Sequence, residues 1–358
     1  MPIRRKTRTV QVGKIAIGSE APIAVQTMTK APVEDVETTL AQIKSAADAG
    51  CDLIRCAVPN VRAAEAFAAV VKRSPLPVVA DIHFDARIAL AAINAGAHKI
   101  RINPGNMADW EALAAVAAAA RNAGIAVRLG INSGSLPSTA DGDLPGAMAE
   151  RALRYAARFE EMGCRALVIS LKAADVWETI KANRLIAKHC DLPLHLGVTA
   201  AGLEEDALLR SALAIGALLA DGIGDTIRLS FTGSPQAEVI AGRRLLRAAG
   251  YLRDEARLIS CPTCGRCRVD LIALAREVRS RLAEFPPGIT VAVMGCEVNG
   301  PGEARAADIG IAACGGKIML FAAGQPLGEV GEDRAIEALL DHARRLPLLG
   351  EHRTTQLE

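Results

Sequence analysis

The stretch PVVADIHFDARIALAAINAGAHKIRIN, residues 77–103, contains a β-branched run, an Ala-rich amphipathic segment and a second β-branched run. The runs at 77–84 and 98–103 have the length and composition of buried β-strands. The segment between them ends at Gly96, a residue type suited to the left-handed cap that closes a helix. The order strand, helix, strand predicts one βαβ unit with two parallel strands.

The same pattern recurs over most of the chain. Six further runs lie at 22–28, 51–58, 125–132, 164–172, 192–199 and 225–232. Eight strands that alternate with helices predict an α/β fold, a (β/α)8 TIM barrel of about 250 residues. The composition agrees with this fold, because 51% of the residues are hydrophobic and only 3% are aromatic, as in parallel sheets packed with Ala, Val, Ile and Leu.

The pattern changes near residues 248–256. From there the sequence predicts a cysteine loop, a helix at 269–285, a strand at 288–295, a Gly-rich turn, strands at 308–314 and 317–324, and a helix at 332–346. We therefore expect two domains: a substrate-binding barrel at 1–250 and a smaller α+β domain at 251–358.

Charge and hydropathy exclude some classes of partner. The net charge is +2 and no long Lys/Arg run occurs, which argues against a nucleic-acid partner. No apolar segment follows the basic N-terminus, and the apolar stretch 208–222 is too short to span a bilayer. We expect a cytoplasmic protein without a membrane partner. Its nine cysteines then point to metal or thiol chemistry, although Cys51, Cys56, Cys164 and Cys190 stand in apolar contexts and are expected to be inert core residues.

Polar residues gather at the predicted carboxyl ends of the barrel strands, where TIM-barrel enzymes place their active sites. They are Arg55, Asp81, His83, Arg101, Asn103, Arg128, Asn132, Lys172, His195, Thr199, Arg228 and Ser230. A guanidinium in a strand needs counter-charge, and its planar fork matches phosphate oxygens. The four arginines and Lys172 therefore predict a positive cup for a small, heavily anionic ligand. Asp81 and Asp221 are the candidate acid or electrostatic groups among these cations.

Two loops of the second domain carry the remaining chemistry. SCPTCGRC, residues 260–267, contains three cysteines, and MGCEVNGPGEA, residues 294–304, contains a fourth. This spacing is compatible with Zn²⁺ or with an iron–sulfur cluster. A structural zinc would use four thiolates, from Cys261, Cys264, Cys267 and Cys296. Alternatively, a tight turn through 300–302 can bring Glu303 beside Cys296. A carboxylate binds iron weakly, so one iron would have a coordination position at which a substrate can replace the ligand.

At these residues the sequence resembles a known family. The two cysteine loops, together with CDLIRCAVP (51–59), VVADIHF (78–84), IRINPGN (100–106), VRLGINSGS (127–135) and LHLGVT (194–199), are similar to the bacterial 4-hydroxy-3-methylbut-2-enyl diphosphate synthases of the non-mevalonate isoprenoid pathway. The similarity covers nearly the whole chain. It implies an oxidoreductase with a [4Fe-4S] cluster held by three cysteines and one glutamate, which fall on Cys261, Cys264, Cys296 and Glu303.

The resemblance also implies a substrate and partners. The substrate would be 2-C-methyl-D-erythritol 2,4-cyclodiphosphate, a small dianion that suits the predicted cup. Its diphosphate would be held by Arg55, Arg101, Asn103, Arg128, Asn132, Lys172, His195, Arg228 and Ser230, with Asp81, Asp221 and Glu303 in catalytic roles. Flavodoxin or ferredoxin would supply electrons, because no dinucleotide-binding GxGxxG follows any predicted strand. The protein would be a homodimer in which the cluster domain of one subunit covers the barrel mouth of the other.

The sequence departs from the family pattern at several positions. Cys267 stands where the family requires no cysteine, Ala200 and Asp221 stand where it usually has Glu, and Thr27 and Lys30 replace the more usual Ser and Asn. Two other classes remain open from the residues alone. A pterin- or corrinoid-dependent transferase predicts no cluster and no reductant. A barrel hydrolase with a zinc clip predicts that the cysteines are structural.

Overall fold

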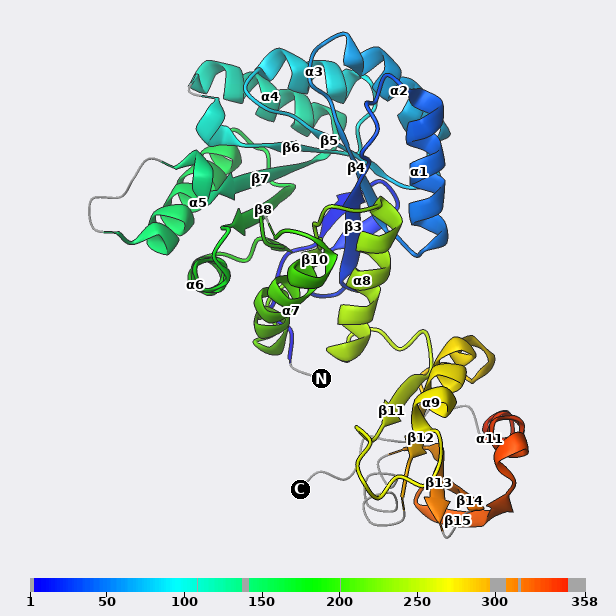
Figure 1. Cartoon of the computed structure of the whole chain (residues 1–358). Helices are drawn as coiled ribbons and strands as arrows, with labels where there is room; N and C mark the ends of the chain where they lie inside the picture. The colour runs from blue at the N-terminus through cyan, green and yellow to red at the C-terminus, as the bar shows by residue number, and fades with distance from the viewer. Residues whose placement is uncertain are drawn as a thin grey trace. The chain divides into compact units, whose positions relative to one another are not determined.

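The computed structural model describes residues 3–107, 109–136, 142–199, 201–296, 307–314 and 317–346. The chain divides into two compact units, residues 1–251 and 252–358, and each is described by itself (Figure 1). Over the described ranges, no helix combines the length and apolar character needed to cross a membrane.

The first unit is the predicted TIM barrel. Its strands are β3 (Ala24–Met28), β4 (Leu53–Ala57), β5 (Val78–Asp81), β6 (Lys99–Ile102), β7 (Ala126–Asn132), β8 (Leu167–Lys172), β9 (His195–Leu196) and β10 (Thr226–Ile227). They form one parallel sheet in the order β8-β7-β6-β5-β4-β3-β10-β9. A parallel bridge between Ile169 and Leu194 brings β8 to the segment that leads into β9. This bridge closes the ring and confirms the barrel.

The helices cover the outside of the sheet (Figure 1). They are α1 (Val36–Asp48), α2 (Ala63–Arg73), α3 (Ala86–Asn94), α4 (Trp110–Ala123), α5 (Leu144–Glu161), α6 (Val176–His189), α7 (Glu204–Ala220) and α8 (Pro235–Ala248), with short 3-10 turns at Pro104–Asn106 and Ser133–Ser135. Several begin at a side chain that accepts a backbone N–H, as Asp85 does from Arg87 and Ser234 from Ala237. These caps fix where each loop at the carboxyl end of the sheet turns into its helix.

An N-terminal hairpin closes the other end of the barrel. Strands β1 (Val10–Val12) and β2 (Ile15–Ile17) pair antiparallel. Their buried side chains form one hydrophobic cluster with residues at the starts of barrel strands, among them Ala24, Leu53 and Ala126. Because the amino ends of the strands are covered in this way, the carboxyl ends form the mouth available to a ligand.

The second unit is an α+β domain. Its sheet has the order β11 (Arg257–Ser260), β12 (Thr290–Met294), β13 (Ile309–Cys314), β14 (Lys317–Ala322) and β15 (Gln325–Val330). The first three strands are parallel and the last two join antiparallel. Helices α9 (Leu271–Ser280) and α11 (Ala335–Ala343), with 3-10 turns at Leu282–Glu284 and Glu332–Arg334, pack on a core that includes Val278, Val291 and Leu339. The strands β11 and β15 were not predicted.

Candidate active site

The register of the parallel strands brings the predicted charges together inside the barrel. Asp81 on β5 is the Cα partner of Arg101 on β6, which is in turn the partner of Arg128 on β7. Arg128 Nη1 donates to Gln26 Oε1 at 3.1 Å. Since β7 and β3 are not neighbours in the sheet, this hydrogen bond crosses the barrel interior. These strands therefore point their polar side chains into the mouth.

Asp81 is the carboxylate at the centre of one group. Arg101 Nη1 donates to its Oδ1 at 3.1 Å, and Arg55 Nε lies 3.7 Å from its Oδ2. Arg101 also lies 2.8 Å from Nε2 of His83, whose ring is 3.6 Å from the carboxylate. Burial raises the pKa of Asp81, but Arg55, the hydrogen bond with His83 and Arg101 together hold it well below the ordinary value. Asp81 is therefore ionised at neutral pH.

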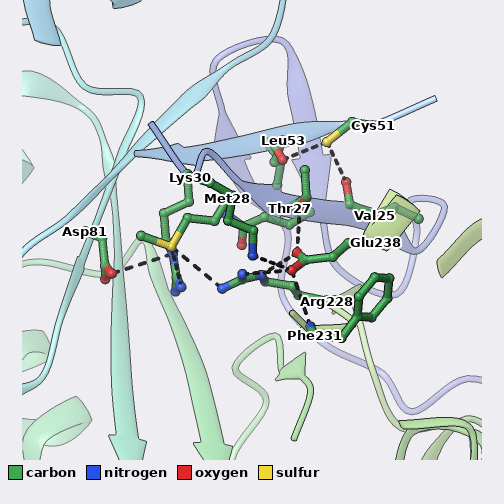
Figure 2. Close-up of polar contacts among 12 residues, drawn as sticks. Val25, Thr27, Met28, Lys30, Cys51, Leu53, Asp81, Arg228, Phe231 and Glu238 are labelled. Atoms are coloured by element: carbon green, nitrogen blue, oxygen red, sulfur yellow. Dashed lines mark hydrogen bonds and ion pairs between the residues drawn. The ribbon is translucent and has the colours of Figure 1, made fainter. Parts of the chain in front are cut away.

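A second carboxylate, Glu238, was not predicted from the sequence (Figure 2). It lies on α8 and is 1% exposed. It accepts from Thr27 Oγ1 at 2.7 Å, Lys30 Nζ at 2.8 Å and Arg228 Nε at 3.2 Å. Burial raises the pKa of Glu238, but Arg228, Lys30 and Thr27 lower it below its ordinary value. The signal in the sequence is its spacing, because Glu238 falls on the buried stripe of α8 between Pro235 and Gly242.

The thioether of Met28 contacts two of the arginines, Arg55 and Arg228, and Figure 2 shows its contact with Arg228. Its Sδ is 3.2 Å from Arg55 Nε, 3.0 Å from Arg55 Nη2 and 3.7 Å from Arg228 Nη1. A thioether is a weak, uncharged acceptor. It separates the two guanidinium groups without neutralising either of them, so an anionic ligand can compete for their N–H groups.

Cations outnumber carboxylates in this interior. The basic side chains are Arg55, Lys99, Arg101, Arg128, Lys172 and Arg228, whereas Asp81 and Glu238 are the carboxylates that contact them within the described ranges. Four buried N–H donors have no partner among the described residues: Gln26 Nε2, Lys99 Nζ, Arg101 Nε and Arg128 Nε. Buried donors without acceptors are costly. A ligand rich in anionic oxygens would satisfy both the surplus charge and the donors.

The remaining predicted binding residues surround this group. Lys172 Nζ is 3.3 Å from His195 Nε2, and His195 Nδ1 is 2.7 Å from Thr226 Oγ1. A Cβ at Gly197 would lie 2.5 Å from Lys172 Nζ, so the glycine leaves room for the ammonium. Burial first, and then the charge of Arg128, hold the pKa values of both Lys172 and His195 well below their ordinary values.

The two predicted asparagines and the serine follow strand ends at the same mouth. Asn103 is buried and accepts from the Gly105 N–H at 3.2 Å. Asn132 ends β7 beside Lys172, its register partner on β8, and Ser230 is half-buried after β10. All three residues lie at the carboxyl end of the barrel strands, where the sequence placed them.

The prediction that Asp221 belongs to this group is wrong. Asp221 caps the carboxyl end of α7 and precedes β10, which places it at the amino end of the strands, opposite the mouth. There its Oδ2 lies 2.7 Å from Arg184 Nε in an exposed ion pair. The local sequence explains the difference, because residues that precede a barrel strand lie at the end away from the active site.

In the second unit the cysteines gather at one edge of the sheet. Cys261 follows β11 and Cys296 follows the neighbouring parallel strand β12. The Gly295 N–H donates to Cys261 Sγ at 3.3 Å, and Cys264 is exposed. A Cβ at Gly295 would lie 2.6 Å from Cys267 Sγ and 3.5 Å from Cys261 Sγ, so the glycine keeps this edge open for sulfur atoms. The donor chemistry and the open edge fit a thiolate-bound cluster.

Glu303, the predicted fourth ligand, and Ala200 lie outside the described residues. Within the described ranges, no three Cys, His, Asp or Glu side chains are grouped to hold a metal ion.

The four cysteines expected to be inert lie in the barrel: Cys51, Cys56 and Cys164 are buried and Cys190 is half-buried. Burial raises the pKa of Cys51 to about 12 and of Cys56 and Cys164 to about 11, which keeps these thiols protonated.

A TIM barrel whose mouth carries more buried cations than carboxylates, followed by an α+β unit with several thiols at one sheet edge, has the architecture of an α/β-barrel enzyme with an added cysteine-bearing domain. Comparison with known families is more specific. Residues 7–243 match the GcpE TIM-barrel domain and residues 257–345 match the GcpE protein C-terminal domain. The chain belongs to the GcpE family, which confirms the resemblance seen in its motifs.

Full-length relatives agree. Proteins of Geobacter sulfurreducens (44% identical; 96% of this chain, 99% of that protein), Clostridium perfringens (46%; 94% and 98%) and Aquifex aeolicus (42%; 96% and 97%) are similar to it. Each is named 4-hydroxy-3-methylbut-2-en-1-yl diphosphate synthase (flavodoxin). Among solved structures, Xanthomonas albilineans dihydropteroate synthase matches with a TM-score of 0.50 and 15% identity, over 68% of this chain and 96% of that one. At that identity the similarity shows the barrel fold alone.

Proposed function

We propose that this chain catalyses the reaction for which its relatives are named, with flavodoxin as electron donor. The cyclic substrate, 2-C-methyl-D-erythritol 2,4-cyclodiphosphate, takes up two electrons and protons, one ring bond from carbon to a phosphate oxygen breaks, and a hydroxyl leaves as water. The product is the linear 4-hydroxy-3-methylbut-2-en-1-yl diphosphate. The observation that carries the proposal is the surplus of buried cations and unpartnered N–H donors at the mouth of a GcpE barrel.

The barrel residues bind and orient this substrate. Arg55, Arg101, Arg128, Arg228 and Lys172 hold the two phosphate groups by charge-assisted hydrogen bonds, which fix the ring in one position. Polar side chains at the rim add hydrogen bonds to the substrate, from Asn103, Asn132, His195 and Ser230. Asp81 stays ionised and keeps Arg55 and Arg101 in place, so its role is electrostatic positioning rather than proton donation. Residues 1–250 are thus the substrate-binding domain.

We further propose that residues 251–358 bind a [4Fe-4S] cluster through Cys261, Cys264, Cys296 and Glu303. Such a cluster would supply one-electron transfer chemistry, and two successive transfers would provide the two electrons that the ring opening consumes. Cys267 is proposed as a bystander, since its thiol donates to the Val269 carbonyl at 3.3 Å. Seven of the cysteines are free thiols, which supports a location in the reducing cytoplasm: Cys51, Cys56, Cys164, Cys190, Cys261, Cys264 and Cys267.

Exposed apolar residues around the mouth support a homodimer. They follow strand ends or begin helices at this face: Val61, Phe84, Trp110, Trp177 and Leu203. Large exposed apolar residues gathered at one face mark an interaction site. We propose that the cluster-binding domain of a second copy covers this rim, excludes water and brings the cluster to the substrate.

Metal content tests the proposed function. Protein purified without oxygen should contain roughly four irons and four acid-labile sulfides per chain, with an EPR signal after dithionite that changes on addition of the cyclodiphosphate. Stoichiometric zinc without iron would contradict the proposal and make the cysteine edge structural.

Subunit complementation tests the dimer. Arg128→Met removes a barrel residue and Cys261→Ser removes a cluster ligand, so each homodimer should be inactive. The two variants are mixed in equal amounts, unfolded together and refolded. If each active site combines two subunits, half of the dimers are heterodimers with one intact site each, so the mixture should recover about a quarter of wild-type turnover. No recovery, with heterodimers demonstrated by mass spectrometry, would contradict the shared site.

A further inference from the structure

Lys99 is a buried amine for which the binding roles above give no account. It begins β6, is fully buried, and its Nζ has no hydrogen-bond or ion-pair partner within the described ranges. It precedes Arg101 by two residues on the same strand, so both side chains lie on the face that points into the barrel. Its register partners, Val79 and Ala126, offer no acceptor from their side chains.

The groups around Lys99 carry mostly positive charge. The barrel strands contribute Arg55 (β4), Asp81 (β5), Arg101 (β6), Arg128 (β7), Lys172 (β8), His195 (β9) and Arg228 (after β10), with the neutral Gln26 from β3, and the outer helix α8 adds Glu238 beside Arg228. Asp81 is already paired with Arg55 and Arg101, and Glu238 with Arg228 and Lys30. No carboxylate in the described part of the chain is within ion-pair distance of Lys99.

An ammonium in this position is strongly disfavoured in the free protein. Burial removes its hydration, and Arg128 and Arg55 repel a further positive charge; in that order they hold the pKa of Lys99 well below its ordinary value. A bound diphosphate reverses this balance, because its negative oxygens would occupy the space that these cations surround.

We propose that Lys99 lies at the base of the diphosphate site and takes up a proton when the ligand binds. Its side chain is an uncharged amine in the free protein and becomes an ammonium when the two phosphate groups bind. The inference rests on the proposed function and deepens it. Substrate binding then takes one proton from solvent, and the new charge strengthens the hold on the diphosphate. Lys99 is a positioning residue in this account, because it acts on the substrate through charge rather than on the reacting bond.

Because binding of the cyclodiphosphate is coupled to proton uptake by Lys99, the affinity for this substrate should depend on pH. Between the lower pKa of Lys99 in the free protein and its higher pKa in the complex, each rise of one pH unit should weaken cyclodiphosphate binding by about tenfold through this group. The free energy of unfolding of the free protein depends on pH in the opposite direction. The unfolded chain binds a proton at this lysine that the folded chain lacks, so this lysine makes the free energy of unfolding rise with pH up to the ordinary lysine value.

Calorimetry on the full-length, oxidised holoprotein tests the inference. The cyclodiphosphate is titrated at pH 8 without reductant, so that no turnover occurs, in two buffers of different ionisation enthalpy. The difference in heat gives the number of protons taken up. Wild type should take up protons, Lys99→Met should take up about one fewer, and Lys181→Met, an exposed lysine on α6, should match wild type.

The outcomes separate the two claims. Equal proton uptake by wild type and Lys99→Met would overturn the inference and leave the proposed function standing. Failure of the wild type to bind the cyclodiphosphate would overturn the proposed function, and the inference with it. If Lys99→Met does not fold, Lys99→Gln keeps the test, because glutamine fills similar space and does not titrate; it should also show a shallower rise of unfolding free energy with pH, and an unchanged slope would overturn the inference.

Discussion

Replacing Glu238 with glutamine should destabilise the barrel by far more than an ordinary Glu→Gln change. Glu238 is 1% exposed and accepts from Thr27, Lys30 and Arg228 at 2.7, 2.8 and 3.2 Å. Glutamine keeps the size of the side chain, but it removes the charge and turns one acceptor into an NH₂ group that faces donors. Arg228 then lies in the interior without its carboxylate.

The size of the effect follows from burial. Removing one partner of a buried ion pair costs about 3–5 kcal/mol, which for a barrel of this size corresponds to a fall in Tm of about 6–20 °C. The matched control is Glu37→Gln, which breaks the Arg73–Glu37 pair. Those side chains are 50% and 76% exposed, so this change should leave Tm almost unchanged, because water and salt screen an exposed ion pair.

Thermal unfolding followed by circular dichroism measures both variants. The pH dependence adds a second check. Because the pKa of Glu238 is lowered in the folded protein, its contribution is present above the ordinary value of 4.5 and is lost as the pH falls through the folded value. The gap between wild type and Glu238→Gln should therefore narrow in acid. A loss below about 1 kcal/mol at pH 7, no larger than that of the exposed control, would refute the reasoning.

Four further predictions concern the two sites. Arg128→Met should raise the Kd for the cyclodiphosphate at least about 30-fold, because truncating a buried charged contact costs about 2–5 kcal/mol of binding; an unchanged Kd in a calorimetric titration would contradict its anchoring role. The free energy of unfolding, from denaturant titrations, should rise between about pH 7 and pH 8, since burial and Arg128 lower the pKa of Lys172 and the unfolded chain binds a proton that the folded chain lacks; a fall would contradict this. Asp221→Asn should keep kcat/KM within about twofold of wild type, since the amino end of a barrel affects stability rather than catalysis, and a large loss would restore Asp221 to the active site. Cys267→Ser should retain the wild-type iron content after anaerobic purification, and loss of iron would make Cys267 a ligand.

The sequence predicted the barrel because its signal is repeated and local. Each strand is a β-branched run, and each helix has an apolar stripe, so even β9 and β10, two residues long, were located by their place in the alternation. The N-terminal hairpin escaped because its strands are three residues long and fall outside the alternation. Strand β11 was not predicted because it is four residues long and borders the cysteine loop.

The site was predicted where charge follows a strand end and missed where burial is decided by distant packing. The arginines were found because a guanidinium in a strand is unusual. Glu238 lies in a helix and Lys99 at a strand start, where acidic and basic residues are ordinarily solvated. Only the closed barrel shows that α8 carries Glu238 against β3 and that Lys99 is fully buried. Asp221 lies away from the site because it precedes β10, and residues before a barrel strand lie at the amino end of the barrel.

The most direct test of the account is turnover itself. Iron-loaded protein is mixed without oxygen with reduced flavodoxin and 2-C-methyl-D-erythritol 2,4-cyclodiphosphate, and phosphorus NMR follows the diphosphate. We predict that the cyclic diphosphate signals are replaced by those of a linear diphosphate whose mass is that of 4-hydroxy-3-methylbut-2-en-1-yl diphosphate, and that Arg128→Met abolishes this conversion. An iron-loaded wild-type protein that binds the cyclodiphosphate and leaves it unchanged would contradict the account.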